Sequence, residues 1–381
     1  MKKFLQQNKI IIFWLVKICF IWRLFLIAIS VIAQKFLLFK ESFPFSEIFL
    51  KPNGPELLRC WGNFDGVHYL SLAQNGYRGL INYEQTFFPL YPFLINKLSF
   101  NFNPLIIALI ISNTALFIAL FLLFKLINLN FSEKVAKTTI IFLLVFPASF
   151  FLGSVYNESL FLTFCLASFY FAKTKKWFLA SVMGFLAAST RLVGVFLLPA
   201  LFFEWSEQRK GKIKELLSLF IIPVGLLIFM IYLKAHFNDP LYFLHLQPLY
   251  GASRSSDKII LFHQVTWRYL KMIFTVDPRS LLYLTIWLEF LTFLLFLFLI
   301  IQQFLKKFPA SYLTFSILSF ITPTLTGTFS SLPRYVLVLF PCFIILSQLI
   351  INKKLKTLWL IVNLLLLAFF CALFTRGYWV A

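Results

Sequence analysis

The chain has 381 residues, of which 60% are apolar or aromatic and only 13% are charged. Soluble domains are about 45–50% apolar and about 25% charged, so this composition excludes both a soluble globular protein and a disordered one. The formal net charge is +21, but the basic residues form short clusters between apolar runs. A nucleic-acid partner is therefore not expected, and we expect an all-α polytopic protein embedded in the lipid bilayer.

Apolar runs recur along the whole chain, and about 20 residues are needed for a helix to cross a bilayer. The first run is too long for the apolar part of a signal peptide and lacks a small-residue cleavage site, so we expect it to be retained. The sequence predicts about nine full spans, at 10–33, 104–124, 138–152, 158–172, 217–234, 281–304, 310–328, 334–351 and 357–375. No repeat or linker separates them, which predicts a single transmembrane domain over residues 1–381.

Clusters of Lys and Arg mark one side of the membrane. The positive-inside rule places clusters such as Lys173, Lys175 and Lys176 in the cytoplasm. The two long connections, 34–103 and 235–280, then face outside, in what we expect to be a prokaryotic cell membrane.

The stretch 177–203 must begin and end on the cytoplasmic side, and it carries Thr190 and Arg191 at its middle. We expect two short arms, 177–189 and 192–203, that enter the membrane and return, because irregular backbone at that depth requires a polar cavity or surrounding protein. The alternative is one crossing helix with a misplaced loop.

The five cysteines contain no C-x-x-C pair, and four of them lie inside apolar runs. They are expected to be small packing residues, so neither a metal site nor a disulfide framework is predicted.

Several candidate catalytic and binding residues lie in the first outer loop. Asp65 and His68 are three residues apart, so a helix that starts near Asp65 places both on one face, next to Tyr69 and an aromatic stretch that includes Tyr91. Asp65 has two interpretations: a helix N-cap, or a carboxylate at the membrane surface that accepts a proton.

Four further groups of polar residues lie at the outer ends of apolar runs or inside them. The triplet Tyr156-Asn157-Glu158 forms either a polar turn or a ligand-facing edge. Arg191 pairs either with a structural partner such as Glu158 or with phosphate oxygens, which its planar fork fits.

The other outer-end residues also have two interpretations. Arg334, followed by Tyr335, either extends to the lipid headgroups or provides a second phosphate-binding cation. Asp239, before Pro240, is first of all a turn residue and is kept as a candidate for substrate binding.

At these residues the chain resembles the PIG-V-like family of GPI-anchor mannosyltransferases and their prokaryotic relatives. Phe64 stands where the family often has Trp, and Thr86 where it often has Ala. The resemblance rests on an ordered set of motifs: Asp65 to Tyr77, Phe87-Phe88-Pro89-Leu90-Tyr91-Pro92, Pro147 to Phe150, Tyr156 to Ser159, Thr190 to Gly194, Asp239-Pro240 and Arg334-Tyr335.

The resemblance implies a GT-C type glycosyltransferase with a large outer first loop, in which Asp65 is the catalytic base. It implies an inverting transfer of a hexose, expected to be mannose, from a polyprenyl-phosphate donor to a glycolipid or other lipid- or protein-linked glycan. We expect Arg191 and Arg334 to stabilise the leaving phosphate, His68 and Tyr69 to contact substrate, and no cofactor or metal. The alternatives are a transporter or flippase of lipid-linked sugars and a non-catalytic assembly subunit.

Overall fold

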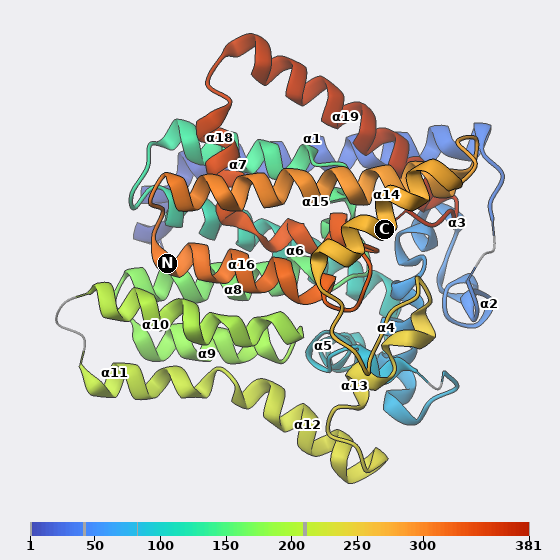
Figure 1. Cartoon of the computed structure of the whole chain (residues 1–381), viewed down its shortest axis with the longest axis horizontal. Helices are drawn as coiled ribbons and strands as arrows, with labels where there is room; N and C mark the ends of the chain where they lie inside the picture. The colour runs from blue at the N-terminus through green and yellow to red at the C-terminus, as the bar shows by residue number, and fades with distance from the viewer. Residues whose placement is uncertain (1, 41–42, 82, 209–211, 381) are drawn as a thin grey trace.

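The structure is a computed structural model that describes residues 2–40, 43–81, 83–208 and 212–380. In this part of the chain the regular structure is entirely helical, and the long helices run roughly along the longest axis of the molecule (Figure 1). Five helices are long and apolar enough to cross a membrane: α1 (Lys2–Phe36, apolar from Asn8), α6 (Pro104–Ile127), the run Ile213–Phe237, α15 (Leu281–Leu305) and α19 (Lys353–Thr375).

These five helices coincide with five of the predicted spans, but a count of about nine is not confirmed in the described residues. A sixth span exists only if a bent pair is counted as one, because Leu332–Val338 and Phe340–Leu349 meet at 86°. The run Ile213–Phe237 consists of α11 (Ile213–Ser218), η7 (Leu219–Ile221) and α12 (Val224–Phe237), and the bent pair consists of α17 (Leu332–Tyr335), η9 (Val336–Val338) and α18 (Phe340–Leu349).

Short helices occupy the other predicted spans. The sequence predicts them as spans because they are apolar, but each has fewer than 18 residues, and several lie inside the bundle where protein rather than lipid surrounds them. They are α7 (Glu133–Val145), η5 (Ser149–Gly153), α8 (Glu158–Lys173) and α16 (Ala310–Thr324).

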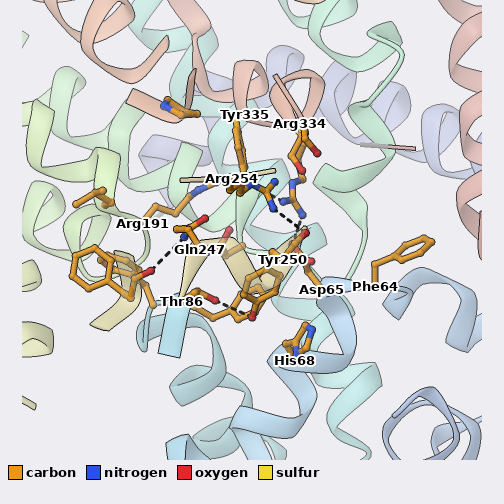
Figure 2. A pocket seen from close by; sticks show the side chains of 18 of the residues that line it. Phe64, Asp65, His68, Thr86, Arg191, Gln247, Tyr250, Arg254, Arg334 and Tyr335 are labelled. Carbon is orange, nitrogen blue, oxygen red and sulfur yellow. Dashed lines mark hydrogen bonds and ion pairs between the residues drawn. The ribbon is translucent and has the colours of Figure 1, made fainter. Parts of the chain in front are cut away.

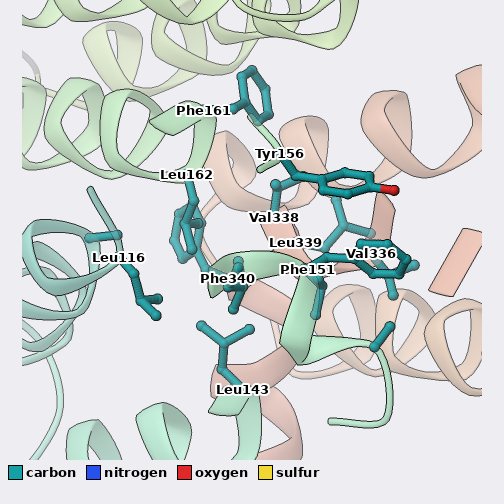
Figure 3. Close-up of a cluster of buried hydrophobic side chains, with 14 of the residues drawn as sticks. Leu116, Leu143, Phe151, Tyr156, Phe161, Leu162, Val336, Val338, Leu339 and Phe340 are labelled. Carbon is teal, nitrogen blue, oxygen red and sulfur yellow. The ribbon is translucent and has the colours of Figure 1, made fainter. Parts of the chain in front are cut away.

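The centre of the bundle is built on the contact between α6 and α8. Small residues of α6, among them Ala115 and Ala119, let the helices approach closely, and the Thr163 hydroxyl on α8 donates to the Ala115 carbonyl at 2.7 Å. Side chains from α8, α18 and the segment around Phe151 fill the space beside this contact (Figure 3).

The stretch 177–203 is divided into two helices. The sequence predicts this division because a stretch that begins and ends on one side of the membrane cannot be a single crossing helix. α9 (Trp177–Ala188) ends before Thr190 and Arg191, a 3-10 turn η6 (Leu192–Phe196) follows, and α10 (Leu197–Glu207) begins after it. Gly194 in η6 lies against the backbone of Ala187 and Ala188, where an added Cβ would come within 2.4 Å of a backbone atom. The turn therefore folds back onto the end of α9, and a single continuous helix here is wrong.

The two ends of the bundle differ in character. Lys125 at the end of α6 donates to Asn8 of α1 at 3.3 Å, and Lys356 at the start of α19 donates to Thr138 of α7 at 2.8 Å, so separate basic clusters gather at one end. Figure 1 shows the N-terminal end of α1 on that side and the helices of the long loops on the opposite side.

Both long loops are folded into short helices rather than extended coil. The first contains α2 (Ser46–Phe49), η1 (Lys51–Asn53), α3 (Glu56–Arg59), η2 (Cys60–Gly62), α4 (Asp65–Asn75), η3 (Gly76–Arg78), η4 (Glu84–Thr86) and α5 (Leu90–Ser99). The second contains α13 (Tyr242–His245), η8 (Gln247–Tyr250) and α14 (Phe262–Thr275). The Thr86 hydroxyl joins the loops by donating to the Tyr250 hydroxyl at 2.9 Å.

Candidate active site

A cavity of about 670 Å³ lies at the loop end of the bundle, where α4, α8, α17 and the break after α9 meet (Figure 2). Six charged side chains from six separate segments line it, together with several aromatic rings. The charged ones are Lys40, Asp65, Glu158, Arg191, Arg254 and Arg334, and the rings include Phe64, Tyr69, Phe87, Tyr250, Tyr335 and Trp379.

Asp65 is the first residue of α4, and its carboxylate does not cap that helix. The N-cap is Phe64, and no side-chain capping bond is formed there. The Asp65 carboxylate instead accepts a hydrogen bond from Nη1 of Arg334. The interpretation of Asp65 as a helix cap is therefore wrong, and its carboxylate is held at the cavity by a cation.

The backbone that leads into Asp65 is constrained. Phe64 has φ = 59°, a region that L-residues rarely occupy, and its ring packs against Phe43 and Trp379 at centroid distances of 4.8 and 5.3 Å. The hydroxyl of Tyr156 donates to the Asn63 carbonyl at 2.9 Å. Strain of this kind persists where the surroundings fix it, and it often marks a functional site.

Arg334 joins two carboxylates. Besides its bond to Asp65, its Nε lies 3.4 Å from Oε1 of Glu158, the first residue of α8. The guanidinium also lies over the rings of Tyr156 and Tyr335, at 5.3 and 5.2 Å. Arg334 is 6% exposed, so its charge is held in an environment that requires such partners.

Arg191 reaches the same carboxylate from the other side. Its Nη1 donates to Oε1 of Glu158 at 3.0 Å, and its guanidinium lies 5.0 Å from the ring centre of Tyr335. The side chain of Asn157 donates to the Thr190 carbonyl at 3.0 Å and so ties the break after α9 to the start of α8. Glu158 is thus the partner of Arg191 that the sequence suggested, and Arg191 lines the cavity as well.

The charges around Asp65 keep it ionised. Burial alone would raise the pKa of Asp65, but Arg334, with further contributions from His68 and Arg254, holds that pKa below its ordinary value. Asp65 is therefore a carboxylate at neutral pH, as an acceptor of a proton must be.

Arg254 is a functional candidate that the sequence did not point to. It lies in the second long loop just after η8 and donates from Nη1 to the Tyr250 carbonyl at 3.3 Å. Among the described residues no carboxylate lies within ion-pair distance of it. No spacing or motif marks this arginine, because only the folding of the loop brings it to the cavity.

Buried polar atoms on the cavity wall lack partners. Oε2 of Glu158 and the hydroxyls of Ser319 and Ser331 form no hydrogen bond with any described residue. Buried groups of this kind are normally satisfied, so they are available to water or to a polar ligand in the cavity. Aromatic rings beside them suit the apolar faces of such a ligand.

Eight of the eleven predicted site residues line this cavity: Asp65, His68, Tyr69, Asn157, Glu158, Arg191, Arg334 and Tyr335. Tyr91 lies behind the wall and donates to the Ala108 carbonyl at 3.1 Å. Tyr156 is buried next to Arg334, and Asp239 lies outside the cavity, where it forms a turn by accepting from the Leu241 backbone at 2.9 Å and pairs with His245 at 2.5 Å. These three do not face the cavity.

Within the described residues no group of three or more His, Cys, Asp or Glu side chains is placed to hold a metal ion. The five cysteines are unpaired, and four of them are buried.

The fold and this cavity define a polytopic helical membrane protein with a charged, aromatic-lined site at one end. The profile of the family described as Mannosyltransferase (PIG-V) matches residues 11–223, more than half of the chain, and the chain belongs to this family. It is accordingly a membrane mannosyltransferase, which uses a sugar donor and a glycan acceptor. The matched region holds Asp65, Glu158 and Arg191, whereas Arg254 and Arg334 follow it. No curated protein matches the chain.

Proposed function

We propose that the chain is a GT-C type enzyme that transfers mannose, with inversion, from a polyprenyl-phosphate donor to a hydroxyl group of a lipid- or protein-linked glycan. The observation that carries this proposal is the meeting of an ionised carboxylate, Asp65, with three arginines, Arg191, Arg254 and Arg334, in one cavity. A carboxylate suits the incoming hydroxyl, and guanidinium groups suit the outgoing phosphate.

In this proposal Asp65 accepts the proton of the acceptor hydroxyl as its oxygen attacks the anomeric carbon of the donor. The bond between that carbon and the phosphate oxygen breaks on the opposite face, and its electron pair leaves with the lipid phosphate. General-base assistance of this kind contributes about 10²–10⁴-fold.

The leaving phosphate needs stabilisation of its negative charge more than it needs a proton. Arg191 and Arg334 already share Glu158, and Arg334 also holds Asp65, so their charges are largely balanced. Arg254 has no such carboxylate among the described residues and is the best placed of the three to meet an added anion. The buried, unpartnered hydroxyls nearby would meet the sugar.

We further propose that the cavity opens on the outer face of the membrane. The support is that the basic clusters gather at the opposite end of the bundle, and such clusters remain on the cytoplasmic side. In a variant without native cysteines, an impermeant thiol reagent on whole cells should label Lys258→Cys and not Lys175→Cys. Labelling of Lys175→Cys would reverse the orientation.

The transfer itself is tested with purified protein, polyprenyl-phosphate mannose and an acceptor pool from a lipid extract. Asp65→Asn preserves size and can still accept a bond from Arg334, so it should fold, bind donor and lose about 100-fold or more in turnover. The matched control is Asp239→Asn, which removes a paired carboxylate outside the cavity and should keep near-normal turnover. Normal turnover by well-folded Asp65→Asn would contradict the assignment of Asp65 as the base.

A further inference from the structure

A second pair of titratable residues lies one helical turn from Asp65. His68 lines the cavity, and its Nδ1 lies 3.5 Å from Oε1 of Glu84 in η4. Glu84 is 0% exposed, and its other oxygen accepts from the Ser71 hydroxyl at 3.1 Å. Nδ1 of His68 and Oε1 of Glu84 lie within ion-pair distance, and neither forms a hydrogen bond with a described residue. The two atoms are therefore available to each other.

The orientation of the His68 ring is fixed by aromatic neighbours. Phe87 stacks on it at a centroid distance of 5.0 Å and an interplanar angle of 25°. The rings of Tyr83 and Tyr250 meet it edge-on at 5.4 and 5.9 Å. With Nδ1 turned toward buried Glu84, Nε2 is the nitrogen left for the cavity. A carboxylate behind one ring nitrogen favours the tautomer that carries the proton on that nitrogen, and it fixes the orientation of the ring.

The charges that surround His68 favour its positive form on one side and oppose it on the other. Asp65 from α4 and Glu84 from η4 are the carboxylates that face it, and the phenols of Tyr83 and Tyr250 border it. Arg254 and Arg334 are the cations, and both act on Asp65 from the far wall of the cavity. Burial raises the pKa of Glu84 although His68 and Ser71 act against that rise, so this carboxylate gains from an imidazolium beside it.

Asp65 cannot retain a proton for long in this setting. Burial opposes its ionisation, but Arg334 and its other neighbours outweigh burial and lower its pKa, so the protonated carboxyl is a stronger acid than an ordinary aspartic acid. The proton that leaves the acceptor hydroxyl therefore needs a second acceptor close by. His68 lies three residues later on the same helix, which is the spacing at which side chains are neighbours.

We infer that His68 and Glu84 form a dyad that takes from Asp65 the proton released by the acceptor hydroxyl. This inference rests on the proposed sugar transfer. The hydroxyl O–H bond breaks, its oxygen bonds to the anomeric carbon, and the proton moves to Asp65 and then to Nε2 of His68. Glu84 stabilises the resulting imidazolium, the lipid phosphate leaves with the electron pair of its own bond, and His68 later returns the proton to water.

The test is the pH dependence of turnover in three proteins. In the wild type, turnover should fall on the acid side between pH 5 and 8, where histidine becomes charged. In His68→Gln that limb should vanish and the plateau should fall by about 10- to 100-fold. In Glu84→Gln the acid limb should move to lower pH by about one unit, and the plateau of turnover should fall by about tenfold. The donor KM should be unchanged in both variants. If the acid limb is unchanged in both variants, His68 and Glu84 have only a packing role and the inferred proton transfer is contradicted.

Two measurements keep the dyad separable from the sugar transfer. Histidine NMR in detergent follows the four histidines of the chain, and the signal that His68→Gln removes should titrate at lower pH in Glu84→Gln. If that signal does not move, the dyad is absent whether or not the protein transfers sugar. If wild-type protein transfers nothing from polyprenyl-phosphate mannose, the proposed function fails while the titration still decides the dyad. Should Glu84→Gln fail to fold, Ser71→Ala loosens the same carboxylate without removing it and should shift the signal in the same direction.

Discussion

The guanidinium of Arg334 donates to the carboxylate of Asp65, 269 residues earlier in the chain. The same guanidinium lies within ion-pair distance of Glu158, so one side chain holds the start of α4 and the start of α8 together. The position and the charge state of the proposed base therefore depend on a residue from the far end of the sequence.

Arg334→Lys should reduce kcat/KM by about 10- to 100-fold. Lysine keeps the charge but lacks the planar fork that contacts two carboxylates, and charge-assisted bonds contribute about 1.5–3 kcal/mol each. Mannosyl transfer assayed alongside thermal unfolding in detergent separates loss of activity from loss of folding. The control is Arg59→Lys, in the same outer region but away from the cavity lining. Equal activity of Arg334→Lys and Arg59→Lys would contradict a role for Arg334 in the transfer.

Arg254→Gln should weaken donor binding with little effect on stability. Since Arg254 has no described carboxylate partner, its removal leaves no buried charge unpaired, and the loss should be confined to the added anion. We expect the donor KM and the inhibition constant of polyprenyl phosphate to rise about tenfold, as one charge-assisted contact implies. Lys258→Gln, an exposed residue of the same loop, is the control. A change in kcat with unchanged donor binding would contradict this role.

The pH dependence of stability has a defined sign at Asp65. Its pKa is lower in the folded protein than its ordinary value of 3.8, so its stabilising contribution is complete above that value and disappears as pH falls through the folded pKa. Melting temperatures of wild type and Asp65→Asn should therefore run parallel from pH 5 to 8 and converge below about pH 4. Divergence between pH 5 and 8 would mean that Arg334 does not lower this pKa.

Tyr269→Phe should destabilise the segment that precedes Arg334. The Tyr269 hydroxyl donates to Glu289 at 2.5 Å and accepts from the Phe329 backbone at 3.2 Å, and Glu289 also accepts from the backbone of Ser331 at 3.3 Å. Losing the hydroxyl leaves buried groups unpaired just before Arg334, which costs about 1–3 kcal/mol. Thermal unfolding should show this loss, whereas Tyr283→Phe on α15, the helix that carries Glu289, should not. Equal stability of the Tyr269→Phe and Tyr283→Phe variants would contradict a stabilising role for the Tyr269 hydroxyl.

Most of the site could be predicted because polar residues in apolar surroundings are conspicuous. Asp65, Glu158, Arg191 and Arg334 each interrupt or border an apolar run, where an ionisable residue is costly unless it has a purpose. Their positions in the sequence marked them as candidates, and the folded chain places them together.

Other features left no such trace. Arg254 lies in a polar loop, where an arginine is unremarkable, and Glu84 lies among aromatic residues that suggest the membrane interface. Asp65 stands where caps are common, so only the conformation of Phe64 shows that no cap is formed. The count of about nine spans is not confirmed in the described residues because α7, α8 and α16 are apolar but have fewer than 18 residues, and hydropathy does not distinguish burial in protein from burial in lipid.

Glu158 forms ion pairs with two arginines that the ribosome adds at very different times. Arg191 follows it by 33 residues and completes a first pair once the turn after α9 has formed. Arg334 arrives only after two more long helices, the run ending at Phe237 and α15, have been made. Until then Asp65 lacks the guanidinium with which it pairs in the folded protein. The end of the bundle that holds the cavity is thus completed late in biosynthesis. A nascent chain released before residue 334 would have Glu158 paired with Arg191, whereas Asp65 would lack its guanidinium partner.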